Sequence, residues 1–197
     1  MPCCGRRGWR AISTMTADQL GLPLGEFDLR LDTLGEQHRA DLKAACAEDP
    51  DIWPIYSSSY DPDHFDAQFD ALLVRPATYP FAILHAGRLI GMTAFLNHVP
   101  ARQTVEIGNT YIVPAARGTG LNRRIKGLLL ERAFASGIRR VEFRVDNRNA
   151  RSKAALLKLG AKLDGIIRAE RTTWTGHVRD AALFSILEQE WPAPPAA

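Results

Sequence analysis

The chain has 197 residues, of which 46% are hydrophobic and 24% charged, and its net charge is +3. These values predict one globular domain with a full core and argue against a disordered chain. No apolar run reaches the roughly 20 residues of a bilayer span and no secretory signal is recognisable, so we expect a cytoplasmic protein without a membrane partner. The three cysteines fit neither a disulfide framework nor a zinc site, and we expect no bound metal.

The first third of the chain predicts one strand and two helices. Residues 1–25 lack periodicity and are predicted to form a poorly ordered leader. Residues 27–31 alternate between apolar and polar, as in a strand. Thr33 and Glu36 form a capping-box pattern that predicts a helix through residue 47. A second helix is predicted near residue 63, where the apolar residues 65, 69, 72 and 73 share one face.

The remainder of the chain predicts three consecutive strands, then a helix, a strand, a second helix and two final strands. A turn at Ala86-Gly87-Arg88 predicts a hairpin, and Gly160 predicts the end of a helix. The expected strands are 81–84, 89–97, 104–113, 141–145, 162–173 and 178–188, and the expected helices are 121–136 and 149–159.

This order predicts the α/β (α+β) class, with a mixed, mostly antiparallel sheet and helices on both faces. Strands joined by hairpins should be antiparallel, whereas the unit from Thr104 to Val145 should be a right-handed parallel crossover. We expect residues 26–192 to form a single domain, followed by a tail at 193–197.

The segment from Ile112 to Leu121 joins a predicted strand to the start of a predicted helix. Pro114 ends the strand because it has no N–H to donate. Gly118 and Gly120 permit backbone conformations that a Cβ disfavours. The unpaired N–H groups of the first helical turn, together with the helix dipole, form an anion site.

Two common nucleotide-binding motifs do not fit this segment. A Walker A loop has Lys-Ser/Thr after its last glycine, whereas Gly120 is followed by Leu121-Asn122. A dinucleotide fingerprint has a third glycine where this chain has Arg123. An ordinary loop with two glycines remains the alternative to an anion site.

Positive charge is concentrated in the window from Pro114 to Lys153, where eleven Lys and Arg face three acidic residues, a net charge of +8. Such a window indicates either a polyanionic ligand or a solvated basic face. Stacking aromatic residues are not interleaved with these charges, so we expect no nucleic-acid partner, although a nucleic-acid-binding module stays the weakest alternative.

The turn Arg117-Gly118-Thr119-Gly120 resembles the Arg/Gln-x-x-Gly-x-Gly/Ala element of the GNAT acetyltransferases, in which backbone N–H groups bind the pyrophosphate of coenzyme A. Read strictly, that element has Arg or Gln where this chain has Ala115. Three further blocks are similar to the RimJ/RimL-like branch, and with them the resemblance covers about residues 27–192. They are the stretch from Leu34 to Trp53, Asp146-x-x-Asn149-x-x-Ser152 with Leu159-Gly160-Ala161, and Gly176 to Asp180 with Phe184-Ser185 and Glu190-Trp191-Pro192.

The resemblance implies a GNAT fold whose splayed strand pair holds acetyl-CoA, and direct attack of an amine on the acetyl thioester. Asn149 would bind a pantetheine amide and Ser152 would lie near the sulfur, and the alternative role of both is to cap a helix. Backbone groups of residues 111–113 would pair with the pantetheine like an added strand. The implied coenzyme residues are Tyr111, Ile112, Val113, Arg117, Gly118, Thr119, Gly120, Leu121, Asn122, Asn149 and Ser152.

The catalytic groups are harder to assign. Many family members use a tyrosine seven residues after that asparagine to protonate the leaving thiolate, and this chain has Leu156 there. We therefore expect Ser152 to donate a hydrogen bond to the sulfur. Glu106 is the candidate base, with a solvent-facing strand carboxylate as the alternative. At pH 7 about one lysine-like amine in 10³ is neutral, against roughly a tenth of α-amines, so the need for a base depends on the acceptor.

The predicted function is acyl transfer from acetyl-CoA to a primary amine of a peptide N-terminus or small molecule. A non-catalytic acyl-CoA sensor on the same fold is the alternative that Leu156 favours. The acceptor's identity, the acyl group and the choice between monomer and homodimer stay open. The acceptor pocket should include Trp53, Tyr56, Tyr60, Asn97, His98, Arg102, Arg171, Trp174 and His177, although core packing is the alternative for the aromatic residues.

Overall fold

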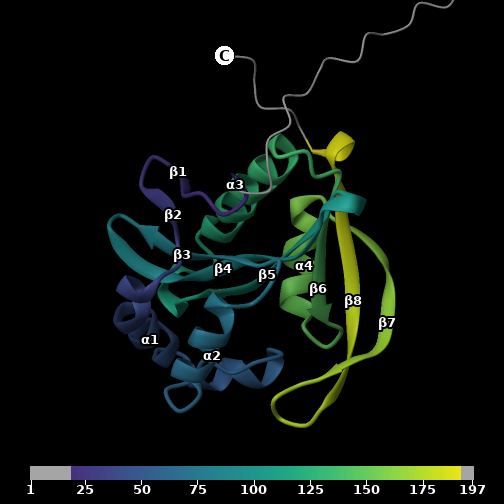
Figure 1. Ribbon diagram of the computed structural model, residues 1–197. Helices are drawn as coiled ribbons and strands as arrows, with labels where there is room; N and C mark the ends of the chain where they lie inside the picture. Colours follow the sequence, from purple (N-terminus) through teal and green to yellow (C-terminus); the bar gives the residue numbers. More distant parts are fainter. Residues whose placement is uncertain (1–18, 192–197) are drawn as a thin grey trace, which may run out of the picture.

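The computed structural model describes residues 19–191, so the predicted tail from residue 193 and most of the predicted leader lie outside it. These residues form a sheet with the strand order β1-β2-β3-β4-β5-β6-β8-β7 (Figure 1). The strands are β1 (Leu24–Glu26), β2 (Leu29–Thr33), β3 (Tyr79–His85), β4 (Arg88–Val99), β5 (Thr104–Ile112), β6 (Arg140–Asp146), β7 (Lys162–Thr172) and β8 (Val178–Leu187).

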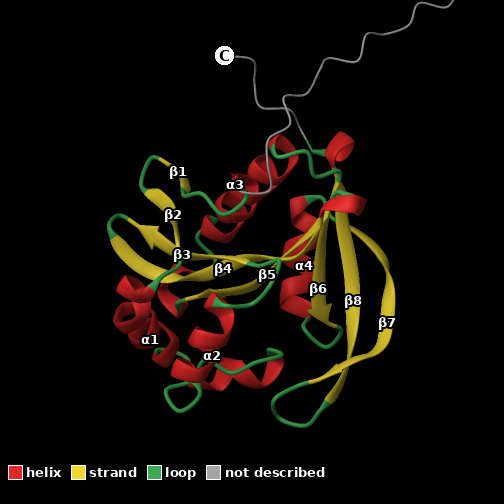
Figure 2. Ribbon diagram, in the orientation of Figure 1, coloured by secondary structure: helices red, strands yellow, loops and turns green. Residues whose placement is uncertain are grey.

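Helices lie on both faces of this sheet (Figure 2). They are α1 (Arg39–Ala47), α2 (Phe65–Leu73), α3 (Leu121–Ala135) and α4 (Ala150–Leu159). Helix α3 covers one face of the sheet, while α1 and α2 cover the other (Figure 1). Among the described strands only β5 and β6 pair in parallel, and the other neighbours are antiparallel. The predicted fold class and the parallel pairing of these two strands are confirmed.

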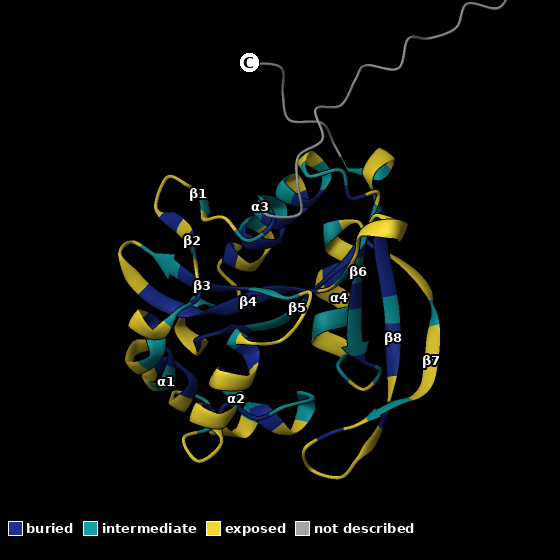
Figure 3. Ribbon diagram, viewed as in Figure 1, coloured by how far each residue is buried: buried dark blue, intermediate teal, exposed yellow. Residues whose placement is uncertain are grey.

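The core lies between the sheet and its helices. Figure 3 shows the central strands buried and the edge strand β7 largely exposed. Helix α3 contributes the buried residues Leu121, Ile125, Leu129 and Ala133, which recur every four residues and therefore share one helix face. Each buried leucine or isoleucine contributes about 1.5–3 kcal/mol through the apolar surface removed from water.

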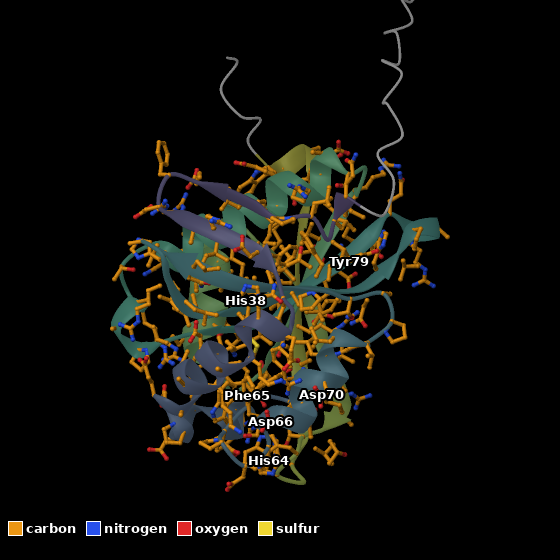
Figure 4. The ribbon with its side chains drawn as sticks, turned by 60° about the vertical axis from the view of Figure 1, so that its left-hand side comes forward. His38, His64, Phe65, Asp66, Asp70 and Tyr79 are labelled. Carbon is orange, nitrogen blue, oxygen red and sulfur yellow. The ribbon has the colours of Figure 1, made fainter. Side chains whose placement is uncertain are left out.

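Helix α2 buries the apolar face that its sequence predicts, and its exposed side contacts α1. The rings of Phe65 and Phe69 stack with centroids 5.5 Å apart, and both side chains are fully buried. On the exposed side of α2, Asp66 and Asp70 form ion pairs with Arg39 of α1 (Figure 4). The apolar spacing that predicted α2 is confirmed.

Two predictions near the N-terminus are wrong in detail. Phe27 does not begin a strand, because it lies in the turn between β1 and β2, where its φ is 51° and its side chain is 98% exposed. Thr33 does not cap a helix, because it remains in β2 and its Oγ1 donates to the carbonyl of Gly21 at 2.6 Å. A 3-10 helix at Glu36–His38 begins after Gly35 instead, and α1 follows it.

The described fold begins earlier than the predicted boundary at residue 26. Leu20 is only 1% exposed and belongs to the core, and β1 begins at Leu24. Between residues 19 and 191, no helix is long and apolar enough to cross a membrane.

Candidate functional site

Strands β5 and β6 separate soon after they meet. They pair at three positions, of which the last joins Glu106 to Glu142, and no pairing between them continues beyond it in the described chain. A β-bulge explains the separation, since Asn109 and Thr110 together lie opposite Thr93 of β4. Asn109 adopts a left-handed conformation with φ 49°. A bulge bends and twists its strand, so β5 turns away from β6 and a wedge opens between them.

The two strands that border the wedge form one wall of a cavity of about 620 Å³. Strand β5 contributes Glu106 and Thr110, and β6 contributes Phe143 and Arg144. The first turn of α3, one face of α4 and the segment around residues 52–60 complete the lining. Several segments distant in sequence therefore converge on this cavity.

Backbone groups of β5 alternate between the wedge and β4. The carbonyls of Thr110 and Ile112 accept bonds from Tyr56 Oη at 2.9 Å and Arg117 Nε at 2.7 Å. Tyr111 pairs with β4, and the N–H of Val113 donates to the β4 residue Ile90 at 2.9 Å. Of the three residues predicted to pair with a ligand as an added strand, only Ile112 directs its backbone into the wedge, because neighbouring strand residues point to opposite edges.

The predicted anion turn lies at one end of the cavity. Gly118 and Gly120 have φ values of 78° and 89°, which non-glycine residues rarely adopt. Gly120 is the N-cap of α3, and no side chain of the described residues caps this helix. Gly118, Gly120 and Asn122 line the cavity. The N–H groups at the start of α3 and the positive end of its dipole are thus available to an anion there.

Arg117 lines the same cavity but is already engaged. Its Nη1 is ion-paired with Asp49, its Nε donates to the carbonyl of Ile112, and its guanidinium lies 5.5 Å from the ring of Tyr111. These contacts fix the arginine and neutralise much of its charge. The backbone donors of the turn are therefore left as the main anion-binding groups at this end.

Other basic side chains at the cavity retain their charge. Arg123, Arg151 and Lys158 line the cavity and form no ion pair within residues 19–191. Their charge favours a ligand with several negative groups.

Helix α4 begins at the cavity with the predicted Asn149 and Ser152. Asn149 Oδ1 accepts a hydrogen bond from the N–H of Ser152 at 3.0 Å, so Asn149 caps the helix. Both residues also line the cavity. The amide nitrogen of Asn149 and the hydroxyl of Ser152 are not needed for the cap. Capping and ligand binding are compatible at this position.

Glu106 is a buried carboxylate in the wall of the cavity. Its side chain is 7% exposed, so the solvent-facing alternative is wrong. Its Oε2 accepts bonds from Asn97 Nδ2 at 2.8 Å and Arg144 Nη1 at 2.5 Å. Donors from β4 and β6 therefore hold the carboxylate in one orientation.

The predicted acceptor residues divide into two groups. Tyr56, Tyr60, Asn97 and Arg171 line the cavity, and Tyr60 Oη accepts a bond from Asn109 Nδ2 at 3.1 Å. The other group does not line it and comprises Trp53, His98, Arg102, Trp174 and His177.

Trp53 and Trp174 have structural roles instead. Trp53 is fully buried, and its ring stacks on that of Tyr111 at 4.9 Å. Trp174 is 40% exposed and donates from Nε1 to the carbonyl of Trp53 at 3.0 Å. This bond ties the β7–β8 loop to the 3-10 helix at Pro50–Ile55. The packing alternative is therefore the better description of Trp53.

Tyr111, Val113, Thr119 and Leu121 also do not line the cavity. Tyr111 is fully buried and donates from Oη to the carbonyl of Ala45 at 2.8 Å. The hydroxyl of Thr119 donates to the carbonyl of Ala116 at 2.8 Å. These residues support the turn and its strand from behind. No cluster of His, Cys, Asp and Glu suited to a metal occurs in the described range.

Lys126 is the residue of the site that the sequence analysis missed. It lies on the buried face of α3, lines the cavity and donates from Nζ to Thr110 Oγ1 at 2.7 Å. Burial lowers its pKa to about 7, and the nearby charge of Glu106 opposes this shift. The sequence contains one indication of this burial. Lys126 precedes Leu129 and Leu130 by three and four residues, so it lies on the same apolar face of the helix.

We predict that wild-type stability, relative to Lys126→Met, rises between about pH 7 and pH 10. The pKa of Lys126 is about 7 in the folded chain and has an ordinary value of 10.5 in the unfolded chain. In this interval the unfolded chain binds one more proton, so unfolding becomes less favourable as the pH rises. Below about pH 7 Lys126 is charged in both the folded and the unfolded chain, so the full cost of burying its charge destabilises the folded chain. Thermal midpoints of both proteins measured across this range test the prediction, which a pH-independent difference contradicts.

Comparisons with known proteins agree with this geometry. The sequence profile described as "Acetyltransferase (GNAT) domain" matches residues 28–162. A candidate acetyltransferase from T. thermophilus is 30% identical, with a TM-score of 0.79 over 86% of this chain and 91% of that chain. A GNAT-family protein from Chromobacterium violaceum is 28% identical, with a TM-score of 0.83 over 98% of each chain.

A more distant structure shares the fold alone. Mycobacterium smegmatis RimJ, solved with CoA-disulfide, is 20% identical, with a TM-score of 0.73 over 84% of each chain. No protein of curated function matches this sequence significantly. The profile match spans more than half of the chain, and the chain therefore belongs to the GNAT acetyltransferase family.

Proposed function

We propose that this protein transfers an acetyl group from acetyl-CoA to a primary amine of a peptide N-terminus or a small molecule. The observation that carries the proposal is a single cavity that contains both the anion turn at Gly118 and Gly120 and the buried carboxylate of Glu106. Such a cavity can bind a phosphate-bearing donor at one end and an amine at the other.

The coenzyme would lie along the wedge. Its pyrophosphate would bind the backbone N–H groups at the start of α3, with Arg123 and Arg151 as additional charges. Asn149 would donate from its amide nitrogen to the pantetheine arm, and Ile112 would offer its backbone N–H. The CoA-disulfide in M. smegmatis RimJ supports a coenzyme A ligand for this fold. Assignment to the RimJ/RimL-like branch and a cytoplasmic location stay predictions.

The amine would attack the thioester carbonyl directly. Tyr56, Tyr60 and Asn97 line the same cavity as Glu106 and would position the acceptor. Glu106 would accept the proton that the amine loses, because its carboxylate is fixed in the cavity wall. Ser152 would donate a hydrogen bond to the sulfur.

We expect Ser152→Ala to lower kcat about three- to tenfold without changing the affinity for coenzyme A. A single neutral hydrogen bond contributes about 0.5–1.5 kcal/mol, which corresponds to this range. The helix cap is retained, because it uses the backbone N–H of residue 152. Steady-state kinetics and calorimetric titration measure the two quantities. If both stay at their wild-type values, the serine has no role in the reaction.

The proposed function is tested by free-thiol release from acetyl-CoA in the presence of α-amine peptides, polyamines, aminoglycosides and amino acids. Release that depends on one of these amines supports the transferase. Binding of acetyl-CoA without release across the whole panel supports the acyl-CoA sensor instead. That second candidate is favoured by Leu156, which lines the cavity as an apolar residue where many relatives carry a tyrosine.

A further inference from the structure

Lys126 reaches the space between the diverging strands from the α3 side of the sheet. Its Nζ is 2.7 Å from Thr110 Oγ1 on β5 and 5.9 Å from the ring centroid of Phe143 on β6. Both positions lie beyond Glu106 and Glu142, the last pair at which the two strands meet. The ammonium group therefore lies where the two strands have separated, and Lys126 lines the cavity.

Fold stability does not explain a lysine at this position. The side chain is 7% exposed, and within residues 19–191 no carboxylate lies within ion-pair distance of its Nζ. The nearest acidic influence is Glu106, which is held by Arg144 and Asn97. An ammonium buried without an ion pair is destabilising, and an apolar residue would suit the stripe better. A destabilising titratable group in a cavity wall is typical of a functional group.

Other groups at this end of the cavity are poor proton donors. The side chain of Leu156 carries no acidic proton. Tyr56 already donates its hydroxyl proton to the carbonyl of Thr110, and burial raises its pKa to about 12. Burial also raises the pKa of Tyr60 to about 12.

We propose that Lys126 is a catalytic residue that protonates the coenzyme A thiolate when the acyl–sulfur bond breaks. This inference rests on the proposed function. As the amine nitrogen bonds to the carbonyl carbon, the electron pair of the C–S bond moves to sulfur, and sulfur takes a proton from Nζ. The amine's surplus proton goes to Glu106 or water and from there returns to the neutral lysine. The products are the amide and the free thiol, and no other reactant is consumed.

The direction of proton transfer is favourable for this lysine. A thiol has a pKa of about 8.5, whereas an ordinary ammonium has a pKa near 10.4. Proton transfer from such an ammonium to a thiolate would be unfavourable, because the ammonium is the weaker acid by about two pKa units. With its pKa lowered to about 7, Lys126 transfers the proton downhill and is still about half protonated at neutral pH. The charged group that acts on Lys126 is Glu106 on β5, which is itself paired with Arg144 on β6.

The first test compares Lys126→Met with Lys162→Met, a matched change on β7 at a lysine that is 72% exposed and outside the cavity. We expect Lys126→Met to lower kcat about 10²-fold, the lower end of the usual contribution of general acid catalysis. Coenzyme A affinity should stay within threefold, and Lys162→Met should resemble wild type. An unchanged kcat in Lys126→Met overturns the inference.

A second test uses the pH dependence of the reaction. The kcat of wild type and of Lys126→Met is measured at saturating acceptor across about pH 6 to 9. We expect the ratio of wild-type to variant kcat to fall as the pH rises above about 7, because Lys126 then loses the proton that it donates, and a merely structural lysine would not change this ratio in that way. A ratio that does not change with pH overturns the role of Lys126 alone. Absence of coenzyme A binding to wild type overturns the proposed function and this inference together.

Discussion

Replacing Gly120 by aspartate is expected to weaken coenzyme A binding at least 100-fold, whereas asparagine at the same position is expected to weaken it less than tenfold. Gly120 has a φ of 89° and is the N-cap of α3. Asparagine and aspartate tolerate positive φ better than other residues, and their side chains have nearly the same shape. No atom lies within 4 Å of a Cβ built at Gly120, so either side chain fits.

The two variants differ in charge. Aspartate places a carboxylate among the N–H donors that a pyrophosphate would use, so it both occupies the donors and repels the ligand. A 100-fold loss corresponds to about 2.7 kcal/mol, which is more than one dipole–anion interaction of about 0.3–1 kcal/mol and therefore requires several. The loss should shrink in about 1 M salt, where the screening length falls to about 3 Å.

Calorimetric titration of both variants with coenzyme A at low and high salt measures these effects. Gly137→Asp is the matched control, because Gly137 also has a positive φ of 82° and open space around it but follows the other end of α3. It should change thermal stability without changing coenzyme affinity. Equal affinities of the aspartate and asparagine variants would exclude phosphate binding at this turn.

The parts of the site that the sequence predicted are encoded locally. The Pro114 strand end, the positive φ values of Gly118 and Gly120, and the Asn149 cap depend on residues within a few positions of one another. Turn and cap residues act through their own backbone, so their pattern is readable without knowledge of the remaining fold. The fold class followed from the order of these local elements.

The parts that the sequence did not predict depend on contacts between distant segments. Arg117 is paired with Asp49, and Arg124 is paired with Glu26 and Asp28, and no local pattern predicts these contacts. Much of the +8 window is neutralised by such pairs, so its net charge overstates the field at the cavity.

The sequence also did not predict where single buried side chains lie relative to the site. Trp53 and Lys126 are both buried, yet one is packed behind the site and the other faces it. Composition and periodicity report that a residue is on an apolar face but not which cavity that face borders. The bulge at Asn109 and Thr110, which opens the wedge, also had no sequence signal, because it is defined by pairing with Thr93 on a neighbouring strand.

Glu106→Gln is expected to lower kcat/KM about 10²- to 10⁴-fold for a lysine-type amine at pH 7, and about tenfold or less for an α-amine. Glutamine retains the shape and can keep a contact with Asn97 or Arg144, but it cannot accept a proton from the acceptor. Without a base, only molecules that are already neutral react. These are about one in 10³ for an amine with a pKa near 10.4 and roughly a tenth for an α-amine.

Glu142→Gln provides the matched control. Glu142 lies beside Glu106 in the parallel pairing and forms an ion pair with the same Arg144 at 2.9 Å, but it does not line the cavity. Loss of the Glu142 carboxylate should weaken the contacts of Arg144 without removing the proposed base. We therefore expect kcat/KM of Glu142→Gln to stay within about threefold of wild type. The comparison therefore separates proton transfer from electrostatic support of Arg144.

The pH dependence gives the sharper test of the base. Below the pKa of the acceptor, its neutral fraction rises tenfold per pH unit, so the activity of Glu106→Gln should rise with that slope. Wild type should rise less steeply, because its ionised carboxylate removes the proton within the complex. The ratio of wild-type to variant activity should therefore narrow as the pH increases toward 10. Parallel pH–rate profiles would show that Glu106 positions the acceptor or Arg144 and does not accept the proton.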